Sequence, residues 1–156
     1  MRKSFASLFL ATLIGLPSLA WSQDINFTTE LGSLYGGRAY VAIYITDNKG
    51  TYQRTLWVAG HKSRYYRHLR DWVRGTGMNS NEYDGLTGAS LIGNRPLKVT
   101  VNVDAKLIDA GYQVRIDSAM EDDRENRAEV IAPLTHADAG KVFTGSGYVT
   151  SFSYQF

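Results

Sequence analysis

The feature that most constrains the fold is an alternation of residue types that recurs along the chain in short runs. It is clearest at residues 38–47, where Val41, Ile43 and Ile45 share one face of an extended segment and Tyr40 and Tyr44 share the other. Because side chains alternate between the faces of a strand, a period of two predicts β-structure. Comparable runs predict seven strands, at residues 25–31, 38–47, 54–60, 97–103, 112–120, 128–134 and 148–156. With turn signals between them, they predict a mainly β, antiparallel β-sandwich.

One segment departs from this period and predicts an insertion at about residues 63–95. Ser63 can cap a helix that starts at Arg64, and Leu69 and Trp72 then fall on one helical face. Gly75 follows, and the chain up to residue 95 is rich in Gly, Asn and Ser with no clear period. We expect an inserted helix and a long Gly-rich loop, and long ordered loops commonly carry function.

The first 22 residues resemble a secretory signal peptide. Arg2 and Lys3 supply positive charge, residues 5–19 are mostly apolar, and small residues precede the expected cleavage after Ser22, with Ala20 as the second choice. Residues 23–156 then form a single β-sandwich domain in the periplasm. The alternative is that the segment is retained as an N-terminal anchor.

Charge and cysteine content exclude several classes of function. The chain has 17 Lys and Arg and 15 Asp and Glu, and removal of Arg2 and Lys3 with the signal leaves 15 of each. A chain without net charge gives no indication of nucleic-acid binding. The absence of Cys excludes disulfides, thiolate catalysis, iron–sulfur clusters and c-type haem attachment.

A seven-residue motif at residues 84–90 carries the main functional prediction. Asp84-Gly85-Leu86-Thr87-Gly88-Ala89-Ser90 resembles the site at which a bacterial flavin transferase attaches FMN, through its phosphate, to the last hydroxyl. Attachment requires an exposed hydroxyl on an accessible turn. The small residues Gly88 and Ala89 leave Ser90 unshielded, and Asp84 and Thr87 would supply recognition contacts. The alternative is a surface turn rich in small residues.

A cationic, aromatic stretch precedes the motif. It contains five basic residues: Lys62, Arg64, Arg67, Arg70 and Arg74. Guanidinium groups and planar aromatic rings can stack on an isoalloxazine ring and offset negative charge on it. We therefore predict that Arg70, Arg74, Trp72 and Tyr83 contact the flavin. The alternative is a surface helix with one buried stripe, in which Trp72 belongs to the core.

Other candidate chemistry is weak. His61, His68 and His136 lack metal-ligand spacing, and the acidic run at residues 121–125 lacks the glycine and the alternating ligands of a calcium loop. We expect no metal site and interpret the acidic run as the end of a hairpin. No acid–base pair is evident, so the sequence favours an electron carrier over an enzyme.

The final strand leaves one competing architecture open. Tyr148, Phe152, Tyr154 and Phe156 alternate at the end of the chain, a pattern also typical of small outer-membrane β-barrels, the smallest of which have eight strands. A cofactor-free periplasmic β-sandwich that binds a ligand or partner is the other alternative to the flavoprotein hypothesis.

Three segments taken together extend the resemblance beyond the motif. Residues 56–58, 64–72 and 83–90 resemble a family of predicted bacterial periplasmic proteins of unknown function, with further similarity at residues 110–114 and at Glu121. This resemblance implies an immunoglobulin-like sandwich with the flavin acceptor on the inserted loop. It also implies a flavin transferase that supplies FMN from FAD, and an inner-membrane electron-transfer partner acting toward iron or siderophore reduction.

Overall fold

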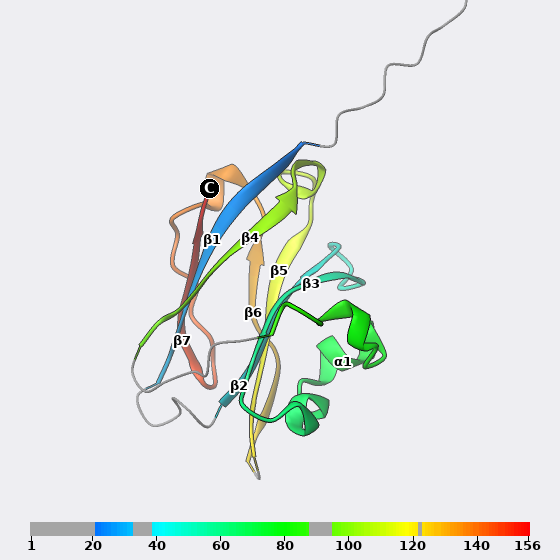
Figure 1. The fold of residues 1–156 in the computed structure, drawn as a ribbon. Helices are drawn as coiled ribbons and strands as arrows, with labels where there is room; N and C mark the ends of the chain where they lie inside the picture. Colours follow the sequence, from blue (N-terminus) through cyan, green and yellow to red (C-terminus); the bar gives the residue numbers. More distant parts are fainter. Residues whose placement is uncertain (1–20, 33–38, 88–94, 122) are drawn as a thin grey trace, which may run out of the picture.

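Two antiparallel sheets pack against each other to form a β-sandwich (Figure 1). The computed structural model describes residues 21–32, 39–87, 95–121 and 123–156. The first sheet has the strand order β4-β1-β7, with bounds Leu97–Asp104, Ser22–Leu31 and Val149–Gln155. The second has the order β3-β2-β5-β6, with bounds Tyr52–Ala59, Ala39–Thr46, Gln113–Met120 and Glu125–Pro133. The mainly β sandwich and its seven strands are confirmed.

The strand order explains the immunoglobulin-like character. The order β3-β2-β5-β6 matches strands C′-C-F-G of an immunoglobulin-type sandwich, and β4-β1 matches E-B. The position of strand A beside B is taken by β7, which comes last in the chain and pairs antiparallel with β1. The fold therefore has the strand neighbours of an immunoglobulin-type sandwich, except that the edge strand beside β1 is the last strand of the chain, β7.

A core of mostly aliphatic side chains lies between the sheets. In β4 the burial alternates strictly over the first seven residues, so that one face of the strand packs inward. β1 contributes Ile25 and Phe27, and Phe27 lies opposite Val99 of β4 and Tyr154 of β7. From the second sheet, Val41, Ile43, Ile45 and Ile116 are among the residues that meet them.

The outer face of the second sheet carries a separate core. Every residue of β2 is buried, because the inserted helical segment covers the face that points away from the first sheet (Figure 1). Aromatic residues dominate this outer core, whose members are Tyr40, Ala42, Tyr44, Val58, Tyr66, Leu69, Trp72 and Ala119. β2 is thus enclosed by two different cores.

The inserted segment differs from the single helix that the sequence predicts. It forms a 3₁₀ helix, η1 (Ser63–His68), then α1 (Arg70–Thr76) after a break at Leu69, and then η2 (Ser80–Glu82). The predicted Ser63 cap is wrong, since η1 includes Ser63 and is preceded by Lys62. No side chain from the adjacent sequence caps η1 or α1. Two further 3₁₀ turns, η3 (Ala105–Leu107) and η4 (His136–Asp138), lie outside the insertion.

Candidate functional site

One buried carboxylate, Asp117 of β5, fixes the insertion to the sheet. Asp117 is completely buried, and its Oδ2 accepts hydrogen bonds from the backbone N–H groups of Asp71 (2.8 Å) and Trp72 (2.9 Å) at the start of α1. Its Oδ1 accepts from the Tyr44 hydroxyl (2.9 Å) and from the backbone N–H of Ala128 on β6 (2.8 Å). These contacts satisfy N–H groups that a helix leaves unpaired at its N-terminus. A strand residue thus replaces the missing local cap.

The charge state of Asp117 is set by competing effects. Burial raises the pKa of its carboxyl group above the ordinary value, although the hydrogen bonds from Trp72, Ala128 and Tyr44 act in the opposite direction. Burial also raises the pKa of Tyr44, and the nearby Asp117 carboxylate raises it further. The Tyr44 hydroxyl therefore keeps its proton and remains the donor in this pair.

Trp72 lies inside the outer core. No part of its side chain is exposed, and its indole N–H donates to Thr55 Oγ1 at 2.9 Å. The ring meets Tyr83 and Tyr66 edge-on, with centroid distances of 5.4 Å and 6.1 Å. Protein atoms cover the indole, so Trp72 has no open face on which a flavin could stack, whereas Tyr83 is only partly buried.

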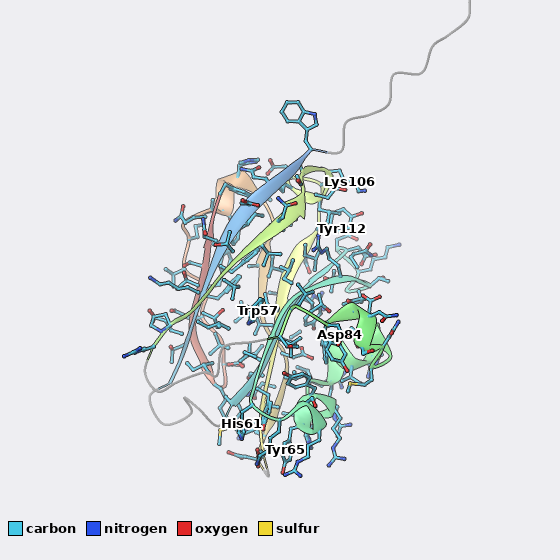
Figure 2. The ribbon with its side chains drawn as sticks, viewed as in Figure 1. Trp57, His61, Tyr65, Asp84, Lys106 and Tyr112 are labelled. Atoms are coloured by element: carbon cyan, nitrogen blue, oxygen red, sulfur yellow. The ribbon has the colours of Figure 1, made fainter. Side chains whose placement is uncertain are left out.

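The described half of the acceptor-like motif forms an exposed turn beside an edge strand. The backbone N–H of Val58 in β3 donates to the carbonyl of Leu86 at 3.1 Å, and Thr87 pairs with Val58 in an isolated parallel bridge. Asp84 and Thr87 are exposed, and Asp84 lies on the side of the molecule that carries the insertion (Figure 2). The motif therefore begins on an accessible surface that β3 holds in place.

The second half of the motif remains a sequence-based prediction. Gly88, Ala89 and the proposed acceptor Ser90 lie outside the described residues. The structure therefore tests neither the acceptor hydroxyl nor the FMN that it would carry.

The two arginines predicted to contact the flavin have different surroundings. Arg70 Nε donates to Glu125 Oε2 at 2.6 Å, and the other oxygen of this carboxylate lies 2.7 Å from His68 Nδ1. The hydrogen bond from Arg70 lowers the pKa of Glu125. Arg74 is 72% exposed and lies 3.5 Å from Asp71 Oδ1. Arg70 therefore forms a close ion pair with Glu125, whereas Arg74 has a longer contact with Asp71 and is largely exposed to solvent.

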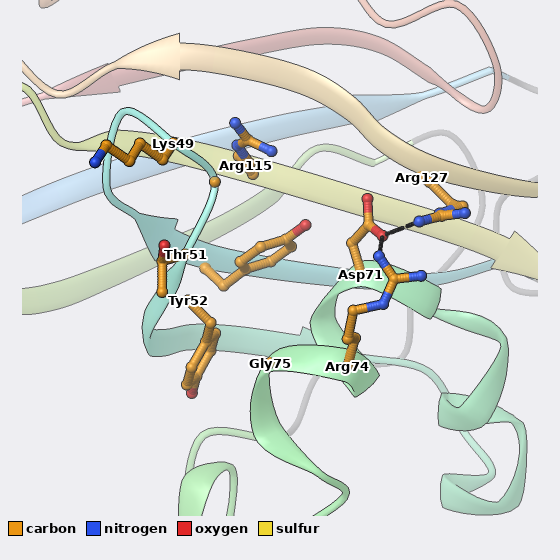
Figure 3. A pocket seen from close by; sticks show the side chains of 10 residues that line it. Lys49, Thr51, Tyr52, Asp71, Arg74, Gly75, Arg115 and Arg127 are labelled. Atoms are coloured by element: carbon orange, nitrogen blue, oxygen red, sulfur yellow. Dashed lines mark hydrogen bonds and ion pairs between the residues drawn. The ribbon is translucent and has the colours of Figure 1, made fainter.

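Arg74 borders a pocket of about 480 Å³ on the insertion side of the second sheet. The β2–β3 turn, α1, β5 and β6 enclose it, and Figure 3 shows the side chains that line it: Tyr44, Lys49, Gly50, Thr51, Tyr52, Asp71, Arg74, Gly75, Arg115 and Arg127. Its size lies within the range of small-molecule sites. The pocket joins a residue predicted for the site, Arg74, to several that sequence reasoning did not identify.

The charged groups of the pocket are strongly unbalanced. Four basic side chains line it, against the single carboxylate of Asp71. Asp71 Oδ1 accepts from Arg127 Nη2 at 2.6 Å and also faces Arg74, as the dashed lines in Figure 3 show. The hydrogen bond to Asp71 raises the pKa of Arg127. This arrangement can bind an anion.

Sequence reasoning missed three of these cations because they lie outside the inserted segment. Arg115 and Arg127 come from β5 and β6, and Lys49 comes from a turn whose sequence indicates only its shape. One signal was present: Arg115 and Asp117 share a face of β5, and neighbouring β2 puts the apolar residues Ala42 and Tyr44 on the same side. Because Arg115 and Asp117 lie beside apolar residues on this face of the sheet, the pattern indicates that another segment of the chain covers the face.

The described residues show neither a metal-binding group nor a membrane-spanning helix. No three His, Asp or Glu side chains among them come together in a way that could hold a metal ion. None of the helices in these ranges has the length and apolar character needed to cross a membrane.

Comparison with known proteins identifies the family. The chain finds no match among curated proteins or among solved structures. A family model described as "Predicted periplasmic protein (DUF2271)" matches residues 22–151, which is most of the chain. The chain therefore belongs to the DUF2271 family of predicted periplasmic proteins, which confirms the periplasmic location inferred from its first residues.

Proposed function

We propose that this periplasmic protein is an electron carrier with FMN attached covalently to Ser90. The observation that carries the proposal is the motif at residues 84–90, whose last residue offers the required hydroxyl. The open geometry of Asp84 and Thr87 supports it, because a modifying enzyme must reach this segment in the folded protein.

The attachment step transfers the FMN group of FAD to the hydroxyl of Ser90. Ser90 Oγ forms a bond to the phosphorus of the FMN half of FAD, the pyrophosphate bond of FAD breaks, and AMP leaves. The proton of the hydroxyl is released. A flavin transferase catalyses this step and is therefore the maturation partner, and the carrier needs no nucleophile-activating base of its own.

Of the four residues predicted to contact the flavin, Tyr83 and Arg74 remain available for it, whereas the surroundings of Arg70 and Trp72 change their roles. Tyr83 is partly exposed beside the motif, and Arg74 presents a cation to solvent. The charge of Arg70 is partly offset by its ion pair with Glu125, and the buried ring of Trp72 packs edge-on against Tyr83. A flavin supplies exchange of one or two electrons, while Asp84, Thr87, Gly88 and Ala89 form the turn that presents Ser90.

The electron partners are inferred from the family resemblance. A periplasmic carrier of this kind would take electrons from an inner-membrane redox protein and pass them to an acceptor outside the cytosol. Attachment through a covalent bond keeps the cofactor on the protein in a compartment that does not make flavins. Iron compounds are the acceptor class implied by the family resemblance.

Mass spectrometry of the exported protein tests the proposal. Coexpression with a flavin transferase should add one FMN minus one water to the mature chain, and the band should fluoresce under ultraviolet light after denaturing electrophoresis. Ser90→Ala should gain nothing, and Ser90→Thr should regain the modification because it restores a hydroxyl.

A matched control tests whether the loss of modification is specific to Ser90. Ser80→Ala removes a different exposed serine from the same insertion and should leave the modification unchanged. An unmodified wild-type chain under these conditions would refute the proposal. Full modification of Ser90→Ala would refute Ser90 as the acceptor.

A further inference from the structure

Arg74 is the only lining residue of the pocket beside α1 that is also a proposed flavin contact, and the chemistry of the other lining residues indicates that the pocket has a ligand of its own. We propose that it binds a small polyanion, a molecule with two or more carboxylate or phosphate groups. The proposal does not depend on Ser90 or on FMN, since the lining residues all belong to the described β2–β3 turn, α1, β2, β3, β5 and β6.

The charge of the pocket favours an anion over a cation or a neutral sugar. Lys49, Arg74, Arg115 and Arg127 line one hollow, and its single carboxylate, Asp71, is shared between Arg74 and Arg127. A concave surface lined by charge of one sign concentrates the electrostatic field. Guanidinium groups bind carboxylate and phosphate through paired hydrogen bonds, which gives the site its preference for oxyanions.

Arg115 provides the most direct indication of a missing partner. Its Nε is buried and has no hydrogen-bond acceptor among the described residues. Its Nη2 donates to Gln113 Oε1 at 3.1 Å, and no carboxylate oxygen in the described ranges lies within 4.0 Å of the guanidinium. A partly buried cation without a counterion is unfavourable, so a bound anion would stabilise this arrangement.

The turn opposite α1 is held in one shape against Arg115. Asp47 Oδ1 accepts hydrogen bonds from the backbone N–H groups of Lys49 (2.9 Å) and Thr51 (2.8 Å). Gly50 has φ +85°, and a Cβ there would lie 2.9 Å from Arg115 Nη1. The turn backbone therefore lies close to the guanidinium and is held in place by Asp47, whereas the side chain of Lys49 extends from the turn with its amine pointing away from Arg115 (Figure 3).

The cations form two groups in the pocket. Lys49 and Arg115 lie at the turn end, and Arg74 and Arg127 lie at the α1 end beside Asp71 (Figure 3). Two separated groups of donors match a ligand with two oxyanion groups better than a single small ion.

Isothermal titration calorimetry on the mature Ser90→Ala protein, made without a flavin transferase, tests the proposal. The probes are citrate, pyrophosphate, inorganic phosphate and acetate, each at 0.15 M salt. Citrate or pyrophosphate should bind with a Kd below about 1 mM, at least tenfold more tightly than acetate. The tighter of the two polyanions identifies the ligand as a carboxylate or a phosphate compound.

Three charge-removing variants locate the binding. Arg115→Gln should weaken polyanion binding about tenfold, as expected for the loss of one charge-assisted contact, and Lys49→Gln should weaken it severalfold. Arg67→Gln removes an exposed cation that does not line the pocket and should have no effect. Lys49 lies on an exposed turn, so Lys49→Gln should fold normally. If Arg115→Gln fails to fold, the affinity of Lys49→Gln for the polyanion tests the site instead.

Two results would overturn the proposal. One is the absence of polyanion binding below about 1 mM. The other is an equal loss of affinity in Arg67→Gln and Lys49→Gln, which would assign binding to the general charge of the surface. Because the protein used has no acceptor serine, neither result bears on flavin attachment, and failed flavin attachment would leave this site unaffected.

Discussion

The two faces of β2 are buried by different means. Toward the first sheet, Val41, Ile43 and Ile45 pack against aliphatic and aromatic side chains that make few directional contacts. Toward the insertion, Tyr44 packs in an aromatic layer and also donates a hydrogen bond to buried Asp117. One strand therefore takes part in an apolar core on one side and in a hydrogen-bonded core on the other.

The two cores differ because one holds two sheets together and the other positions a short helix. Apolar packing is strong but non-directional, and it suffices to hold two sheets whose strands are already ordered by backbone pairing. The described part of the insertion contains the seven-residue helix α1 and two short 3₁₀ segments, which are marginal without tertiary contacts. Hydrogen bonds at Asp117 fix where α1 begins and so fix one wall of the cationic pocket.

Removal of a large side chain from the apolar core should have the largest effect. Phe152 is completely buried between the sheets, stacked on Phe27 at a centroid distance of 6.1 Å. Phe152→Ala should lower the free energy of unfolding by about 4 kcal/mol, through lost burial and the cavity that remains. Urea denaturation measures the change. A loss below about 1 kcal/mol would show that the sheets do not depend on this core.

Removal of the Asp117 carboxylate tests the hydrogen-bonded core. Asp117→Ala leaves four donors without their acceptor and should cost about 3 kcal/mol in the free energy of unfolding. Asp117→Asn keeps one acceptor oxygen and should cost about half as much. If both variants unfold like the wild type in urea, the outer core owes its stability to packing alone, and the contrast with the inner core disappears.

A pair of glycine substitutions tests how closely α1 approaches β3. A Cβ at Gly75 would lie 2.4 Å from the Cβ of Tyr52, whereas Gly77, with φ +60°, has no atom within 4 Å of the corresponding position. Gly75→Ala should therefore destabilise the fold by about 2 kcal/mol through overpacking, against about 1 kcal/mol for Gly77→Ala through backbone strain. Thermal unfolding of both variants measures the difference. Stabilisation by Gly75→Ala, the usual helix effect, would contradict this contact.

Loss of a single hydroxyl gives a smaller effect on the same core. Tyr44→Phe preserves the ring but removes the donor to Asp117, and it should cost about 1.5 kcal/mol in the free energy of unfolding. In the Asp117→Ala background the same substitution should cost clearly less, because its partner is already absent. A double-mutant cycle by urea denaturation measures this coupling. Additive effects would mean that the hydroxyl and the carboxylate act independently.

The pH dependence of stability should reveal the buried carboxyl group with the smallest signal. Burial raises the folded-state pKa of Asp117 above its ordinary value of 3.8, so the folded protein binds more protons than the unfolded chain between the two values. The stability due to this group is present below pH 3.8 and is lost as the pH rises through the folded pKa. The difference in unfolding free energy between wild type and Asp117→Asn should therefore fall with rising pH. A rise would contradict the direction of the shift.

The strands were predictable because each carries a local pattern. The alternation of Val99, Val101 and Val103 in β4 needs no distant information. Glu121 and Asp123 lie between β5 and β6, as predicted for the end of a hairpin. The helix was predicted in its position but not in its form. The start of α1 is bonded to Asp117, which lies 46 residues beyond Asp71, and no helical period can indicate so distant a partner.

The candidate site was predictable only where its residues are consecutive. The acceptor-like motif can be recognised because Asp84 and Ser90 belong to one short segment. The cationic pocket could not, since Lys49, Arg115 and Arg127 become neighbours only through strand pairing and the packing of α1. The equal numbers of basic and acidic residues over residues 23–156 concealed this local excess, because Asp71 is the one acidic residue among those that line the pocket.

The complete enclosure of β2 has a consequence for how the sequence can change over time. β1 and β4 each present alternate positions to solvent, where substitutions have little cost, but β2 has no such position along its eight residues. A change at any of them must be matched by a partner in one core or the other. Relatives of this chain should therefore diverge fastest at the exposed positions of β1 and β4 and slowest along β2, with tolerated changes in β2 occurring in compensating pairs.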